Sequence, residues 1–144
     1  GYVSTYRVNR DVLLDVVMTL GSQMALTQPD VIIVEVADGL LQRETARLFN
    51  TPEFTHWADG VIFAANDALG AQAGVSWLTA RQLPVFAITG VLTSSQLARR
   101  EAEDICGLPI YHPGALARPS VSQYIYTCLQ YRRQNQSAIE TESG

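Results

Sequence analysis

The chain contains no lysine, so its ten basic residues are all arginine. It has no Gly-x-x-x-x-Gly-Lys-Ser/Thr stretch, and by itself it cannot form the phosphate loop in which a lysine reaches the β and γ oxygens of a nucleotide. The formal net charge is −4, and the arginines are spread along the sequence. Because no basic stripe is present, we predict no nucleic-acid partner.

Cysteine and histidine are equally scarce, with two of each. Cys106 and Cys128 lack the short spacing typical of a zinc site, and we expect both to be buried and reduced. His56 and His112 have no second histidine or cysteine at ligand spacing, which favours packing or surface roles over metal binding. No Gly-x-Ser-x-Gly motif indicates a serine hydrolase.

No apolar stretch reaches 18 residues, and no basic, apolar and small-residue leader is visible. We therefore predict no membrane partner and a cytoplasmic location. At 144 residues and 47% hydrophobic content the chain can bury a core. We expect residues 1–133 to form a single α/β domain or the C-terminal part of a larger one. Residues 134–144 lose the apolar periodicity, which predicts a poorly packed tail.

The most informative segment is residues 30–39, Asp-Val-Ile-Ile-Val-Glu-Val-Ala-Asp-Gly. Residues 31–34 are apolar without alternation, which predicts a strand covered on both faces. Glu35 and Asp38 follow where such a strand would leave the sheet at its carboxyl end. Ligands of open α/β sheets bind at that edge, so both carboxylates are candidate catalytic residues.

The same pattern recurs twice downstream. The apolar run at residues 61–65 is followed by Asn66 and Asp67, and the run at residues 85–92 is followed by Thr93, Ser94 and Ser95. Each polar turn precedes a helix-like stretch. This alternation predicts right-handed crossovers, and hence an α/β fold with a parallel sheet and flanking helices.

Two further helices are predicted from apolar periodicity. A stripe at helical spacing predicts a helix that ends near Ala25, formed by Val12, Val16, Leu20 and Met24 with Leu13 and Val17. Residues 113–133 predict a helical region interrupted near Pro119. Its expected inward positions are Val121, Ile125 and Leu129, with Tyr124 and Tyr131 as partial cover.

The order of these landmarks resembles the second half of a dethiobiotin synthetase-like P-loop NTPase, within the larger group that includes cobyrinic acid diamide synthases and chromosome-partitioning ATPases. Residues 34–39 resemble the acidic strand of that family, and residues 59–70 its next strand and Leu-Gly turn. Residues 77–81 resemble its crossover helix, residues 83–85 the entry to the next strand, and residues 107–110 its late Gly-x-Pro strand. The resemblance covers about residues 30–113. It implies a three-layer, Rossmann-like P-loop NTPase fold or a remnant of one.

The resemblance also implies cofactors, namely ATP and Mg²⁺ in a parent protein, with none bound tightly to this chain alone. Glu35 would organise Mg²⁺, usually through water. Asp38 either joins it or simply belongs to an Asp-Gly turn. The sequence departs from the family where Val36 replaces a glycine and where Thr93-Ser94-Ser95 replaces an asparagine.

Each remaining site residue has a structural alternative. Asn66 and Asp67 precede a helix N-terminus, which favours nucleotide anions, but Asp67 can also cap that helix. Thr93 and Ser94 offer hydroxyls to a phosphate or base, or a cap to the following helix. Arg43 could clamp an anion or lie on a solvated helix face.

Two functions of different class follow. The chain is either the C-terminal part of an ATP- and Mg²⁺-dependent synthetase or ATPase, inactive alone, or a non-catalytic α/β interaction or dimerisation module. A metal-assisted enzyme without ATP is a weaker third option. In the family, the phosphate-loop strand lies between the acidic strand and the strand at residues 61–65. We expect its place to be taken by an N-terminal P-loop segment absent from this sequence, by a second copy, or by direct pairing of residues 31–36 with residues 61–65.

Overall fold

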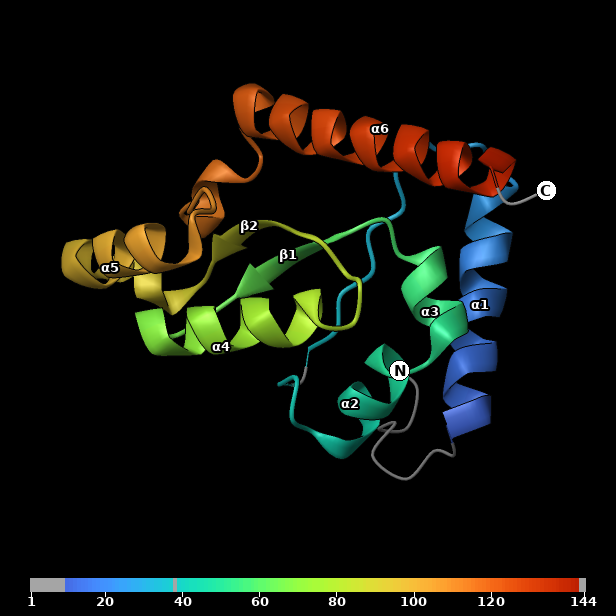
Figure 1. Ribbon diagram of the computed structural model, residues 1–144, viewed down its shortest axis with the longest axis horizontal. Coiled ribbons are helices and arrows are strands. Elements are labelled where there is room, and N and C mark those ends of the chain that lie inside the picture. The colour runs from blue at the N-terminus through green and yellow to red at the C-terminus, as the bar shows by residue number, and fades with distance from the viewer. Residues whose placement is uncertain (1–9, 38, 143–144) are drawn as a thin grey trace. The chain divides into compact units, whose positions relative to one another are not determined.

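The computed structural model describes residues 10–37 and 39–142. By its internal contacts the chain divides into two compact units, Gly1–Trp57 and Ala58–Gly144. All the regular structure among the described residues of the first unit is helical, and the second unit combines helices with a parallel pair of strands (Figure 1). The predicted mixture of helices and parallel strands is confirmed in the second unit.

The first unit contains α1 (Arg10–Ala25), α2 (Arg43–Phe49) and α3 (Pro52–Trp57). Between α2 and α3 lies Thr51, which is fully buried and donates its hydroxyl to the Arg47 carbonyl over 2.8 Å. Phe49 and Phe54 meet edge to face with ring centroids 5.3 Å apart. Their rings form the buried centre of this helix pair.

The helix predicted to end near Ala25 is confirmed as α1. Its stripe is not buried: Val12, Val16, Leu20 and Met24 are between 41% and 51% exposed. Leu13 and Val17, one residue further round the helix, are half-buried. The periodicity identified the helix correctly and marked an apolar face that remains largely accessible.

The predicted acidic strand is absent, because residues 31–37 form no regular structure. Ile33 is 88% exposed, and Val31 and Val34 are each 39% exposed. A strand exists only where a neighbour pairs with its backbone, and no described residue pairs with this segment as a strand. Direct pairing of residues 31–36 with residues 61–65, one of the three expected alternatives, is not among the strand pairs of the described residues.

The second unit is built on β1 (Val61–Ala64) and β2 (Val85–Thr89), which pair in parallel. Phe63 is the register partner of Ile88, and Ala64 that of Thr89. On its other edge, β2 makes a parallel bridge from Ile88 to Ile110. The predicted late strand at residues 107–110 is reduced to this one bridge.

Two helices pack on one face of the strands, α4 (Ala68–Thr79) and α5 (Gln96–Cys106). Their core combines small residues of the helices with Ile88 of β2 and with residues of the segments beside the strands: Ala65, Ala68, Ala71, Ile88, Leu92, Ala102 and Ile110. Alanine at the helix positions lets the helices approach the strands closely. The predicted crossovers from strand to helix are confirmed for α4 and α5.

On the opposite side of the strands lies α6 (Pro119–Glu142), seen above them in Figure 1. The Tyr124 hydroxyl donates to the Phe86 carbonyl over 3.1 Å and joins α6 to β2. Val121 is buried, Ile125 and Leu129 are half-buried, and Tyr131 is 69% exposed. The break near Pro119 is confirmed, since a short 3-10 helix, η3 (Pro113–Ala115), precedes α6.

Residues 134–142 continue α6 as helix, where the loss of periodicity had suggested only a tail. Its poor packing stays a prediction. Cys106 and Cys128 are both half-buried, so the burial expected for them is only partial. Their reduced state stays a prediction. Within the described parts of the chain, no helix is both long and apolar enough to cross a membrane.

Candidate functional site

The carboxyl ends of β1 and β2 are joined directly through their backbones. The Ala65 N–H donates to Thr89 O over 2.9 Å, and the Leu92 N–H donates to Ala65 O over 3.1 Å. The second bond fixes η2 (Val91–Ser94), the 3-10 helix after β2, against the end of β1. The two predicted polar turns, Asn66-Asp67 and Thr93-Ser94, therefore lie at the same edge of the sheet.

Asp67 is the N-cap of α4, which was one of the two roles expected for it. Its backbone is extended, and its Oδ1 accepts the Gly70 N–H over 2.6 Å. The side chains of Asp67 and Asn66 are both exposed. Capping uses one carboxylate oxygen, so Asp67 keeps a second acceptor for a ligand or a metal-bound water.

The side-chain hydroxyls of Thr93 and Ser94 differ in their availability to a ligand. The Thr93 hydroxyl donates to Gly90 O over 2.7 Å, so its proton is already used, whereas Ser94 is exposed. The cap of α5 is the next residue, Ser95, whose hydroxyl accepts the Ala98 N–H over 3.3 Å. The cap expected at Ser94 was thus placed one residue too early, which leaves the Ser94 hydroxyl without a capping role.

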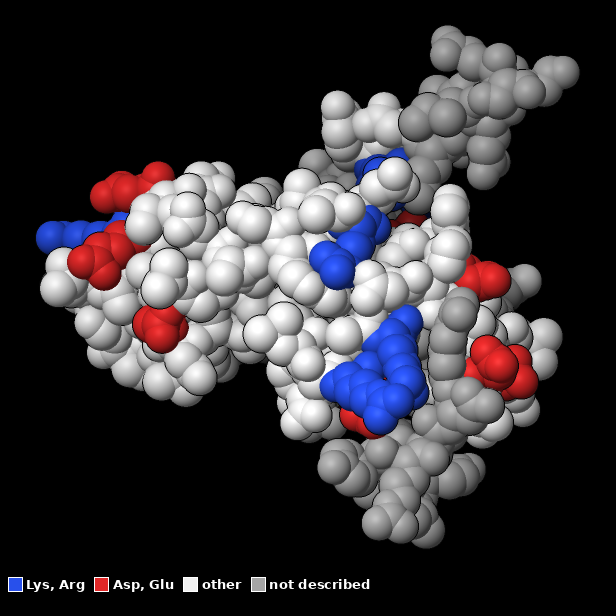
Figure 2. Space-filling model, turned by 60° about the horizontal axis from the view of Figure 1, so that its bottom comes forward, with Lys and Arg blue, Asp and Glu red and all other residues white. Residues whose placement is uncertain are grey.

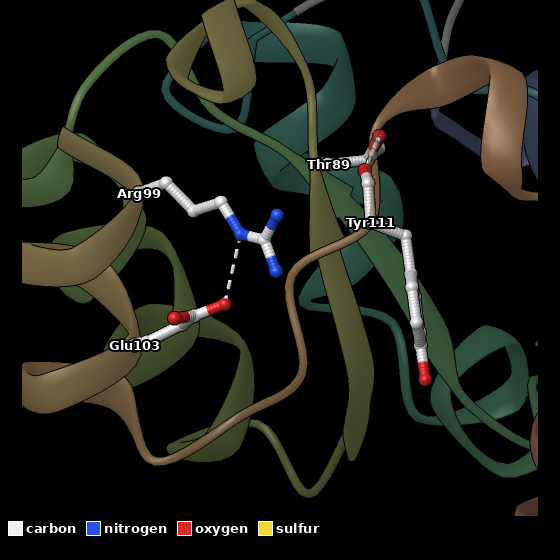
Figure 3. A network of polar contacts seen from close by, with 4 residues as sticks. All are labelled: Thr89, Arg99, Glu103 and Tyr111. Atoms are coloured by element: carbon white, nitrogen blue, oxygen red, sulfur yellow. Dashed lines mark hydrogen bonds and ion pairs between the residues drawn. The ribbon is translucent and has the colours of Figure 1, made fainter. Parts of the chain in front are cut away.

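The third polar turn at this edge follows Ile110. Tyr111 is tied to β2 by its N–H, which donates to Ile88 O over 2.9 Å, and by its carbonyl, which accepts the Thr89 hydroxyl over 2.7 Å. Figure 3 shows Thr89 and Tyr111 side by side. The next residue, His112, is exposed, and its Nδ1 accepts the Gly114 N–H over 3.1 Å. The surface role expected for His112 agrees with this exposure.

The sequence interpretation missed a pair of cations at the start of α5. Arg99 and Arg100 are exposed, and Arg99 forms an ion pair with Glu103 over 2.9 Å (Figure 3). The acidic residues of α5 come after them, which opposes the helix macrodipole. The sequence does contain a signal for this pair, namely basic residues placed before acidic ones in a helix. That order of charge is unfavourable for helix stability.

The acidic candidates belong to the first unit. Glu35 is exposed on the irregular segment, and Asp38 lies outside the described residues. A site shared by Glu35, Asp38 and Asn66 or Asp67 therefore stays a prediction. Arg43 begins α2 and is exposed. Among residues 10–37 and 39–142, no three His, Cys, Asp or Glu side chains are grouped to hold a metal ion.

Figure 2 shows basic side chains flanked by acidic ones at the left of the view. A stripe of several phosphate-binding arginines would be the usual footprint of nucleic-acid binding.

Two groups of the second unit have shifted acidity. Burial raises the pKa of the Cys106 thiol, so this thiol is held in its neutral form. Burial, together with a side-chain hydrogen bond to Cys128 and the neighbouring Tyr111, raises the pKa of Tyr124 to about 12. Neither group is poised for nucleophilic or acid–base chemistry near neutral pH.

Comparison of the chain with protein-family models, with curated proteins and with solved structures finds no match.

Proposed function

We propose that this chain is the distal part of an ATP- and Mg²⁺-dependent α/β domain of the dethiobiotin synthetase-like P-loop type. Its phosphate loop is supplied by a polypeptide segment outside these 144 residues. The longer polypeptide that includes this segment is called the parent below. The chain alone does not hydrolyse ATP, because no lysine is available to contact the β and γ phosphates.

The observation that carries the proposal is the free edge of β1. The Val61 and Ala65 N–H groups donate toward Pro84 O and Thr89 O on the side of β2. Because backbone direction alternates along a strand, the Ile62 and Ala64 N–H groups face the other edge. No strand among the described residues pairs with that edge. A phosphate-loop strand in parallel orientation would pair there.

The sheet face beside this edge is also uncovered. Ile62 is 40% exposed and Ala64 is exposed, whereas their register partners Ala87 and Thr89 are only 0% and 8% exposed. Parallel sheets are normally covered on both faces. The contrast between the two strands supports a missing strand and its helix at β1, rather than a loosely packed sheet overall.

In the parent, the polar turns at the carboxyl edge would meet the nucleotide. The exposed Ser94 hydroxyl and the Asn66 amide offer hydrogen bonds to phosphate or base, and Asp67 offers a carboxylate oxygen. Glu35, assisted by Asp38, would organise Mg²⁺ through water. Thr93 would contribute its remaining acceptor lone pairs, since its proton is bound to Gly90 O.

The proposal is tested by calorimetric unfolding of the parent and of the 144-residue chain, each with and without ATP and Mg²⁺. A ligand at a hundred times its dissociation constant stabilises the protein that binds it by ~2.7 kcal/mol. We expect a stabilisation of that order for the parent and none for the chain at micromolar ATP. ATP with a chelator in place of Mg²⁺ is the control for the metal.

Two results would contradict the proposal. A parent that shows no stabilisation by ATP at any concentration would exclude nucleotide binding. Micromolar binding of ATP to the chain alone would show that the missing phosphate loop is not needed.

The second candidate function is a non-catalytic interaction or dimerisation module. The specific observation in its favour is that Leu69, Val91 and Leu97, at the starts of α4, η2 and α5, are 74%, 67% and 68% exposed. These helices start at the carboxyl edge, where a nucleotide enzyme needs polar groups. A gene in which no phosphate loop precedes this region would favour this candidate over the first.

A further inference from the structure

Arg99 of α5 is a basic side chain that the proposed function leaves without a role. Its Nε–H donates to Glu103 Oε1 over 2.9 Å, and its side chain is 50% exposed. Among the described residues, no polar partner other than Glu103 contacts this guanidinium. The N–H donors of both terminal nitrogens therefore remain available to a ligand.

The ion pair with Glu103 fixes the direction of these donors. Because Glu103 contacts the Nε side of the guanidinium, the two terminal nitrogens are directed away from it, toward the segment that leads to Tyr111 (Figure 3). Tyr111 lies at the carboxyl end of β2, since its carbonyl accepts the Thr89 hydroxyl over 2.7 Å. The Arg99 guanidinium is therefore directed toward the polar turn that follows Ile110.

The same turn provides a second donor. The Gly114 N–H donates to the Nδ1 atom of His112 over 3.1 Å, so the proton of the neutral imidazole is on Nε2. His112 is exposed. A guanidinium directed toward the turn and an imidazole N–H on it are both donors, which is the chemistry that an oxyanion requires.

The acidic residues of α5 lie mostly on other sides of the helix. With about 3.6 residues per turn, Glu101 lies roughly 160° and Asp104 roughly 140° around the helix from Arg99. Glu103, roughly 40° away, is the acidic residue of α5 that shares the side of Arg99. Its carboxylate is already paired with Nε, so it orients the guanidinium without covering the terminal nitrogens.

The pair of Arg99 and Glu103 is not explained by the stability of α5. A cation in the first half of a helix opposes the macrodipole, and a basic residue before an acidic one is the weaker order for this spacing. An ion pair as exposed as this one contributes little to stability. A residue that breaks a local rule without a gain in stability is expected at a functional site.

We propose that Arg99, oriented by Glu103, binds a phosphate group at the turn that follows Ile110, with His112 as the second donor. The planar fork of a guanidinium donates two parallel hydrogen bonds to two oxygens of one phosphate. This geometry distinguishes the site from an attraction between charges, which a lysine would supply equally well.

A phosphate at this turn has two possible sources, a nucleotide or another phosphorylated ligand. The bridge from Ile88 to Ile110 places the turn on the side of β2 away from β1. The proposed phosphate-loop strand pairs with the free edge of β1, so β1 and β2 lie between that loop and this turn. The phosphate is therefore that of a ligand other than the nucleotide held by the loop. The inference goes beyond the proposed function and does not depend on it.

The experiment is an NMR titration of the isotope-labelled chain with inorganic phosphate, at constant pH and ionic strength. The matched control is Arg100, which is exposed and lies roughly 100° around the helix from Arg99. We expect the side-chain signals of Arg99 and His112 to shift with one half-saturation concentration. It should be at least about tenfold lower than that of Arg100, because hydrogen bonds between charged groups are the strong ones.

Three variants and a second anion separate recognition from charge. Arg99→Gln should raise the half-saturation concentration of the His112 signal by about tenfold, whereas Arg100→Gln should leave it unchanged. Arg99→Lys keeps the charge but not the fork and should restore only part of the binding. Acetate in place of phosphate should bind more weakly. Circular dichroism of each variant checks that its fold is retained.

Several results would overturn the inference. Arg99 and Arg100 signals that shift alike, full binding by Arg99→Lys, or different half-saturation concentrations for Arg99 and His112 would each exclude a shared phosphate site. Acetate that binds as tightly as phosphate would exclude phosphate as the specific ligand.

The source of the phosphate is tested in the parent. Arg99→Gln should leave the stabilisation of the parent by ATP and Mg²⁺ unchanged, and its loss would assign Arg99 to the nucleotide and overturn the separate ligand. A parent with Arg99 intact that ATP does not stabilise would contradict the proposed function alone. The two proposals therefore fail separately.

Discussion

Gly90 lies so close to Ala65 that a Cβ atom on residue 90 would be 2.6 Å from the Ala65 carbonyl oxygen. Gly90 also has φ of +105°, a conformation in which side chains are strained. Both facts follow from the way η2 turns back over the end of β1. This close approach lies between the two polar turns of the candidate site, which the backbone hydrogen bonds of Ala65 with Thr89 and Leu92 hold together.

The first prediction is that Gly90→Ala lowers the free energy of unfolding by at least about 2 kcal/mol, from backbone strain and the clash with Ala65 together. Gly107 is the matched control, because it has φ of +63° and a Cβ there would meet nothing within 4 Å. Gly107→Ala should therefore cost only about 1 kcal/mol, the strain alone. Urea denaturation measures both, and equal losses would show that the contact with Ala65 relaxes freely.

The second prediction separates the two roles of Asp67. Asp67→Asn keeps a side-chain acceptor for the Gly70 N–H and should leave stability nearly unchanged, whereas Asp67→Ala should cost about 1 kcal/mol. In the parent, Asp67→Asn should still lower affinity for Mg²⁺ and ATP if the carboxylate contacts the metal-bound water. Calorimetric titration measures this affinity, and an unchanged value for Asp67→Asn would leave capping as the whole role.

The sequence predicted those parts of the molecule that depend on local chemistry. Asp67 as a cap and the break near Pro119 each rest on one residue whose preference is strong. The apolar run at residues 85–92 was too long for a strand, because β2 ends at Thr89 and residues 91–94 form η2. The parallel pairing of β1 and β2 followed from apolar runs and crossover helices. The two polar turns of the candidate site lie at one edge because the carboxyl ends of parallel strands lie at the same edge of a sheet.

The features that could not be predicted depend on which segments pair with or pack against a residue, and not on the residue itself. Residues 31–37 have the composition of a buried strand, but no described strand pairs with them, so Glu35 is on an irregular segment. The apolar stripe of α1 likewise has the spacing of a buried helix face, but its side chains are largely exposed. Arg99 and Arg100 were missed because a pattern of apolar residues carries no information about charge order in a helix.

The third prediction concerns alkaline pH. Tyr124 has a pKa of about 12 in the folded chain, against its ordinary value of 10.0. Between these values the unfolded state releases the phenolic proton more readily, so stability is complete below pH 10 and falls as pH rises toward 12. Tyr124→Phe should lose this part of the pH dependence. Tyr131→Phe, at a tyrosine that is 69% exposed, is the control and should retain it in chemical denaturation from pH 9 to 12.

The fourth prediction uses the reversed charges of α5. Arg100→Glu replaces a cation with an anion in the first half of this helix and should raise the free energy of unfolding by about 0.5 kcal/mol. Arg47 is in the last turn of α2, where a cation is favourable, so Arg47→Glu should have the opposite sign. Urea denaturation measures both variants, and an Arg100→Glu variant that is less stable than the natural chain would contradict the charge argument.

The fifth prediction concerns the free edge of β1, measured by amide hydrogen exchange. The N–H groups of Ile62 and Ala64 face this edge and should exchange quickly in the isolated chain, whereas those of Val61 and Ala65, bonded to Pro84 O and Thr89 O, should be protected. In the parent, the proposed phosphate-loop strand accepts hydrogen bonds from Ile62 and Ala64, and their exchange should slow by orders of magnitude. Protection that appears in the isolated chain only as its concentration rises would place a second copy at β1. Slow exchange of Ile62 and Ala64 in the dilute monomer would show that the chain closes this edge by itself, and the need for an added strand would disappear.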